Sequence, residues 1–183
     1  CSSRSDESGG QAGVGGLPGA CARGAPPYGF AQIVDISDEQ HPRIVSKLML
    51  EVDDVAHCPQ LVKEPPEAGG GVLDYSAERC NVDRVNNPTM AACGYRNAGL
   101  RVFDIRDPFH PREIAYYKPP AARKAFLPGS GRWSKDADRT TDYVAGYARF
   151  HKVRGSGELQ IWFVGSDSGF QVVRFSDDFK ARH

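Results

Sequence analysis

The sequence predicts an almost all-β protein, and three observations lead to that fold class. First, 20 Gly and 13 Pro among 183 residues are too many for a helical bundle and are typical of a chain with many turns. Second, short runs of β-branched and aromatic residues recur from Tyr28 onward, with turn residues between them. Third, apolar residues at helical spacing are nowhere sustained over several turns, so long amphipathic helices are not expected.

Internal repeats specify the architecture further. Residues 29–43 align with residues 97–112, and residues 80–105 overlay residues 150–175 without a gap at an offset of 70. One repeated unit contains four strand patterns, expected at 80–85, 89–95, 99–105 and 112–118. Four short antiparallel strands per unit is the arrangement of a β-propeller blade, so the repeats predict propeller blades.

The chain is expected to hold about two and a quarter such blades. These are the last two strands of one blade, a full blade and the first three strands of a third, at residues 28–52, 80–118 and 147–176. Two long loops, at 53–79 and 119–146, complete the partial propeller over 28–183. Residues 1–27 are rich in Gly, Ala, Ser and Pro, and we interpret them as a flexible linker or loop.

The repeated segments resemble a known family. FAQIVDISDEQHPR and GLRVFDIRDPFHPREIAYY are similar to LVIVD-repeat proteins, which are β-propellers found mostly in bacterial extracytoplasmic or surface proteins. The resemblance covers residues 28–176, but the third copy has Arg174 where Asp is expected and lacks the Pro turn and fourth strand. It implies further blades and no single biochemical activity. We therefore expect the C-terminal portion of a longer protein, or dependence on blades supplied by a partner.

Composition narrows the class of protein. The 23 basic and 23 acidic residues cancel, so no bulk positive field exists and nucleic-acid binding is not expected. The longest apolar stretches, such as Ile161 to Val164, have the length of a strand, and no transmembrane segment is predicted.

Five cysteines favour an oxidising compartment, and hence a secreted, periplasmic or cell-surface location. Cys1 precedes a Gly/Ser-rich run, as in a processed lipid-anchored protein, although we favour a fragment start. A disulfide between Cys58 and Cys80 is expected to fix a long loop onto its blade, worth about 3 kcal/mol, with Cys21 as a competing partner. Cys93 is interpreted as a buried small hydrophobe.

The densest group of metal-ligand types is Asp53, Asp54, His57 and Cys58. Carboxylate, imidazole and thiolate together suit a divalent ion, whereas the alternative is an ordinary solvated acidic loop. No other cofactor is predicted. No nucleophile elbow, phosphate-binding loop or zinc-protease motif occurs, so no catalytic residue is assigned.

Other candidate residues have a structural explanation that is simpler than a functional one. The His-Pro-Arg tripeptide at 41–43 recurs at 110–112, and Asp35 recurs as Asp104, so the fold itself explains these residues as turn formers. His151 falls in the strand nearest a propeller's channel, where a hydrogen-bonded structural role competes with a place on a ligand path.

One face of the expected propeller carries both long loops and the turns between second and third strands. Long loops on one side of a rigid scaffold commonly form binding sites. A basic stretch there suits an anionic glycan, a peptide or a neighbouring acidic loop, whereas the simpler interpretation is a solvated loop or one that pairs with the acidic loop. The candidate face residues are Arg96, Asn97, Arg123, Lys124, Arg132, Trp133 and Asp167.

Two functional hypotheses follow. The first is a non-enzymatic propeller scaffold of an extracytoplasmic or surface protein, which binds a partner or ligand through the face with the long loops. The second is a metal-dependent enzyme whose channel site is completed by blades outside this chain, like the selenium-binding and methanethiol-oxidising propellers. The second rests on fold analogy alone. A structural repeat segment without a ligand of its own is a third interpretation.

Overall fold

A computed structural model describes residues 16–63, 75–121, 141–144, 146–166 and 168–182. In that part of the chain the secondary structure is mostly β, with three antiparallel sheets and few helices. The elements, in chain order, are α1 (Gly16–Ala22), β1 (Ala31–Asp35), β2 (Arg43–Leu48), two 3-10 turns (Glu51–Asp53 and Val55–His57), α2 (Cys58–Leu61), β3 (Arg79–Val82), β4 (Met90–Gly94), β5 (Leu100–Asp104), β6 (Arg112–Tyr117), β7 (Arg149–Lys152), β8 (Leu159–Gly165), β9 (Gly169–Arg174) and α3 (Asp177–Arg182).

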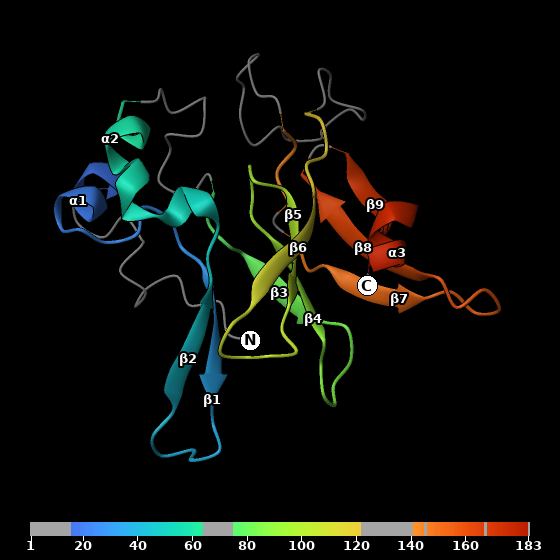
Figure 1. Cartoon of the computed structure of the whole chain (residues 1–183). Coiled ribbons are helices and arrows are strands. Elements are labelled where there is room, and N and C mark those ends of the chain that lie inside the picture. The colour runs from blue at the N-terminus through green and yellow to red at the C-terminus, as the bar shows by residue number, and fades with distance from the viewer. Residues whose placement is uncertain (1–15, 64–74, 122–140, 145, 167, 183) are drawn as a thin grey trace.

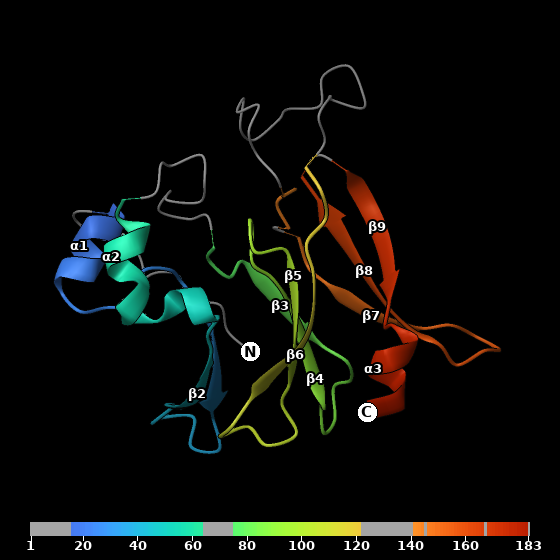
Figure 2. The same ribbon diagram turned by 45° about the horizontal axis from the view of Figure 1, so that its top comes forward.

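The strands form three sheets that follow one another along the chain. The first sheet is β1-β2, the second is β3-β4-β5-β6 and the third is β7-β8-β9, each with antiparallel neighbours. Figures 1 and 2 show the three sheets in a row, with α1 and α2 beside the first. The all-β prediction and the positions of the expected strands are therefore confirmed. No helix among the described residues is long and apolar enough to span a membrane.

The backbone repeats as well as the sequence. The β1–β2 register shifts between Ile33 and Val34, and the β5–β6 register shifts between Val102 and Phe103, which are the equivalent positions of the two copies. A bulge at the same place in both hairpins indicates that the repeated sequence specifies the same local twist.

Successive sheets pack face to face through alternating side chains. We call the face of a sheet on the side of the preceding sheet in the chain its front face, and the opposite face its rear face; the first sheet thus contributes only its rear face to a junction, and the third only its front face. At the first junction, rear-face residues of β1 and β2 meet the front face of the second sheet, with buried Ala31, Leu48, Ala91, Cys93 and Phe103. At the second junction, the rear face of the second sheet meets the front face of the third, with buried Ala92, Leu100, Val102, Ile161 and Phe163. Because neighbouring residues of β4 enter different clusters, one strand supplies both cores.

The segment before the first sheet differs from the expected flexible linker. Residues 16–22 form α1, whose Leu17 is 3% exposed and packs with Tyr28 and Leu61. A disulfide joins Cys21 to Cys58 and holds α1 against α2. The prediction of a flexible linker or loop is therefore wrong for residues 16–22, which form a helix held by burial and a crosslink, while residues 1–15 lie outside the described part of the chain.

The predicted Cys58–Cys80 disulfide is also wrong. Cys80 is bonded to Cys93, and the Cα atoms of these two residues are 4.0 Å apart. The physical reason is the strand register, since Cys80 of β3 lies directly opposite Cys93 of β4. Cys93 is fully buried as expected, but as half of a disulfide rather than as a free thiol.

Candidate ligand face

The turn between β4 and β5 meets the segments that precede β3 and β7 at one end of the sheets. Tyr143 accepts a hydrogen bond from the Ser166 amide at 2.9 Å, and Arg96 and Val144 exchange two backbone hydrogen bonds of 3.1 Å. The Glu78 amide donates to Gly94 at 2.8 Å. The Arg96–Val144 pair ties the second sheet to the third at this end, which we call the loop face.

The β4–β5 turn positions Arg96 by its backbone conformation. Arg96 has a φ of 42° and Gly99 a φ of 81°, and the Tyr95 amide closes the turn onto the Gly99 carbonyl at 2.8 Å. Gly99 is required twice over, because a Cβ there would also lie 2.4 Å from the Tyr117 carbonyl oxygen. The turn is therefore a rigid support for its side chains.

Arg96 forms an ion pair with Glu78. The side chains are 15% and 26% exposed, so the pair is half-shielded from solvent and links the turn to the start of β3. Both residues also line a shallow depression that includes Arg79, Tyr143 and Ser166. Arg96 therefore has a structural partner on the candidate face.

Arg79 is different from Arg96, because its guanidinium is exposed. Its Cζ atom lies 5.1 Å from the centre of the Tyr147 ring, in cation–π geometry. Arg79 begins β3, and Arg149 begins β7, which neighbours β3 across the sheet junction. Arg79 lies opposite Gly94, whereas Arg149 lies opposite Trp162, two residues from the repeat equivalent of Gly94. Both arginines are exposed, and neither has a carboxylate partner within the described residues. Sequence analysis missed this pair, although the repeat offset of 70 residues would have revealed it.

Two of the predicted face residues lie at this turn. Arg96 is in the ion pair above, and Asn97 is 9% exposed, with an Oδ1 atom that has no hydrogen-bond partner in the described part of the chain. The remaining predicted face residues lie outside the described residues: Arg123, Lys124, Arg132, Trp133 and Asp167.

The predicted metal ligands are not arranged as a metal site. Cys58 is committed to a disulfide, which corrects its assignment as a thiolate ligand. Asp54 accepts a hydrogen bond from the Ala56 amide at 2.9 Å, and His57 lies in the 3-10 turn that follows. No group of three or more His, Cys, Asp or Glu side chains in the described ranges is placed to hold a metal ion.

Asp53, the fourth predicted ligand, is fully buried in the structure. Its Oδ2 accepts a hydrogen bond from the Leu50 amide at 2.8 Å, and its Oδ1 has no partner among the described residues. Burial raises the pKa of this carboxyl from 3.8 to about 7, against the opposing effects of the Leu50 amide and the Arg101 charge. Asp53 thus belongs to the core rather than to an exposed acidic loop.

The repeated turn residues have the structural role expected of them. Asp35 accepts from the Ser37 amide and Asp104 from the Arg106 amide, both at 3.0 Å. Hydrogen bonds from Ser37 and then from Arg43 lower the pKa of Asp35 to about 2. The aspartates Asp38 and Asp107 likewise accept turn amides and approach the rings of His41 and His110 at 2.9 and 2.8 Å.

His151 packs as an aromatic ring. Its centre lies 4.1 Å from that of Trp162 on the neighbouring strand. His57 and His151 belong to elements at opposite ends of the row of sheets, beside α2 and in β7 (Figure 1).

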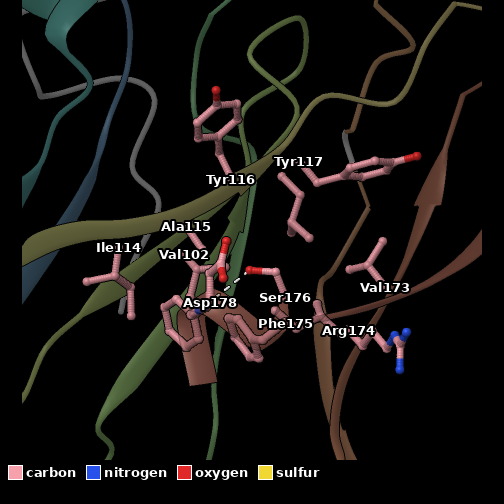
Figure 3. Close-up of a pocket in the computed structure, with 13 residues that line it drawn as sticks. Val102, Ile114, Ala115, Tyr116, Tyr117, Val173, Arg174, Phe175, Ser176 and Asp178 are labelled. Carbon is pink, nitrogen blue, oxygen red and sulfur yellow. Dashed lines mark hydrogen bonds between the residues drawn. The ribbon is translucent and has the colours of Figure 1, made fainter. Parts of the chain in front are cut away.

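An apolar groove lies between β6 of the second sheet and β9 and α3 of the third. Figure 3 shows Tyr117 and Val173 on its two sides, with Phe175 beside α3. Among the described residues the third sheet ends at β9, without a counterpart of β6, and the groove lies on this side of the sheet. Sequence analysis identified the missing strand but not the groove that its absence leaves.

Comparison with known proteins adds no assignment: no family model and no curated protein matches the sequence.

Proposed function

We propose that this chain is a segment of an LVIVD-type β-propeller that serves as a non-enzymatic binding scaffold. The propeller architecture is supported by the way in which successive sheets cover one another. In the first two sheets, the rear-face residues of the third strand of the repeat are covered by the next sheet, as with Leu100 at 1% and Val102 at 2% exposure. The equivalent residues of the third sheet, Phe170 and Val172, are 62% and 48% exposed. A further sheet stacked there would bury them in the same way.

The ligand is proposed to be an anionic group bound at the loop face. The observation that carries this proposal is the pair Arg79 and Arg149, two exposed arginines that begin the adjacent strands β3 and β7 and have no described carboxylate partner. Guanidinium groups recognise carboxylates and sulfates through paired N–H donors. A sulfated glycan or an acidic peptide fits this chemistry.

The two disulfides support an extracytoplasmic location. Cys21–Cys58 and Cys80–Cys93 would be reduced in most cytosols and persist in oxidising compartments. An outside-facing scaffold with a cationic site is consistent with a partner that carries acidic groups at the cell surface.

The test uses the full chain with two probes, heparin and a polyglutamate peptide, and measures their affinity by isothermal titration calorimetry at low and moderate salt. The double variant Arg79→Ala/Arg149→Ala is expected to bind at least about tenfold more weakly than the wild type. The matched control is Arg84→Ala/Arg154→Ala, which removes two exposed arginines at equivalent positions of the turns that follow β3 and β7. Equal losses in both variants, or no binding of either probe to the wild type, would contradict the proposal.

A further inference from the structure

The third sheet has one strand fewer than the second. In the second sheet β6 pairs with β5, whereas β9, which is the repeat equivalent of β5, pairs only with β8. No strand or isolated bridge within the described residues contacts the other edge of β9. An unpaired edge of this kind presents a row of backbone donors and acceptors.

The hydrogen-bond pattern of the second sheet identifies which groups of β9 are available. The Tyr95 amide donates to Gly99 and the Ile105 amide donates to Thr89, so the odd-numbered residues from 99 to 105 face β4. Residues 100, 102 and 104 therefore face β6. Their equivalents in β9 are Phe170, Val172 and Arg174, whose backbone N–H and C=O groups are directed to the open edge.

The groove beside this edge has the shape left by an absent strand. Leu48 of β2 is 1% exposed, because the second sheet covers it at the first junction. Tyr117 holds the same register position in β6, opposite Leu100 as Leu48 is opposite Ala31, yet it is 38% exposed. In Figure 3 its ring projects over the groove toward Val173. The rear face of β6 thus lacks the cover that β2 has.

We propose that an extended polypeptide segment adds to β9 as a fourth antiparallel strand and fills this groove. Two features of one site select such a strand: the backbone groups of the edge pair with any extended chain, and the apolar floor selects alternating apolar side chains. The occupant is a strand of the β6 type from outside these 183 residues. Within the chain, the stretches 1–15, 64–74 and 122–140 carry Gly, Pro and charged residues instead of an alternating apolar run.

The probe is a fluorescein-labelled peptide with the sequence of residues 111–118, PREIAYYK, which contains β6 itself. Its binding to the full chain is measured by fluorescence anisotropy, with a scrambled peptide as the control. We expect saturable binding that the scrambled peptide lacks. Indistinguishable titrations of the two peptides would overturn the proposal.

Two pairs of variants locate the binding at the β9 edge. Val172→Pro removes an amide that faces the open edge and spares the ladder to β8, so it is expected to weaken binding at least about tenfold, whereas Val172→Thr retains binding. In the peptide, N-methylation at Ala115, which lies opposite Val102 in the second sheet, is expected to abolish binding. N-methylation at Tyr116, whose amide faces away, is expected to be tolerated.

The two N-methylated peptides keep the test valid even if Val172→Pro fails to fold, because both are titrated into the wild-type protein. Binding that is insensitive to the position of the N-methyl group would place the peptide elsewhere and refute strand addition. This inference is independent of the anionic site, since the arginines of the loop face take no part in it.

Discussion

The buried carboxyl of Asp53 makes the stability of this fold depend on pH in an unusual direction. Its pKa is raised from 3.8 to about 7 by burial, so the folded protein keeps the proton that the unfolded chain releases above pH 4. The free energy of unfolding therefore falls as the pH rises from 3.8 to 7. This difference between the pKa values of Asp53 in the folded and unfolded states corresponds to a loss of about 4 kcal/mol of unfolding free energy.

Asp53→Asn separates this effect from all other titrations. The amide oxygen can still accept the hydrogen bond from Leu50, but the side chain never becomes charged. We expect the variant and the wild type to have similar stability at pH 4, and the variant to gain up to about 4 kcal/mol relative to the wild type above pH 7.

The assay is urea unfolding between pH 4 and 8, followed by tryptophan fluorescence with the disulfides intact. The quantity compared is the difference in unfolding free energy between variant and wild type at each pH. A difference that stays constant across this range would refute the argument, because it would mean that Asp53 titrates alike in both states.

Two other predictions concern the second and third sheets. Replacing both Cys80 and Cys93 by Ala removes a crosslink between residues 13 apart and is expected to lower the unfolding free energy by about 3 kcal/mol in urea unfolding. A non-reduced peptide map that lacks this pair would contradict the β3–β4 register. Gly99→Ala is expected to cost about 1–3 kcal/mol more than Gly155→Ala, because both have positive φ but only the first places a Cβ against the Tyr117 carbonyl. Equal thermal stability of the two variants would show that the close approach is absent.

Strand positions were accessible from sequence because their signals are local. Asp35 and Asp104 end equivalent strands and accept turn amides, and this chemistry depends only on residues two positions away. Because the sequence repeats, strands predicted for the β5–β6 hairpin could also be assigned to the equivalent β1–β2 hairpin. For the same reason, the structural interpretation of the repeated His-Pro-Arg turns agrees with their hydrogen bonds.

The features that sequence analysis missed depend on tertiary placement. Whether Cys80 meets Cys58 or Cys93 is determined by the register of β3 on β4 and by the docking of α1, neither of which spacing reveals. Asp53 was taken for a solvated or metal-binding residue because its acidic neighbours gave no sign that it enters the core. The contact of the Arg79 guanidinium with the Tyr147 ring, and its lack of a carboxylate partner among the described residues, became visible only when its surroundings were known.

The face-to-face stacking of the sheets is the central claim, and nuclear Overhauser effects between side chains test it most directly. The structure predicts effects from the methyl groups of Leu100 and Val102 to Ile161 and Phe163 across the second junction. It also predicts effects from Leu48 to Phe103 or Ala91 across the first. Side chains of the second sheet that show effects only within their own sheet would contradict the stacking, and with it the proposed propeller.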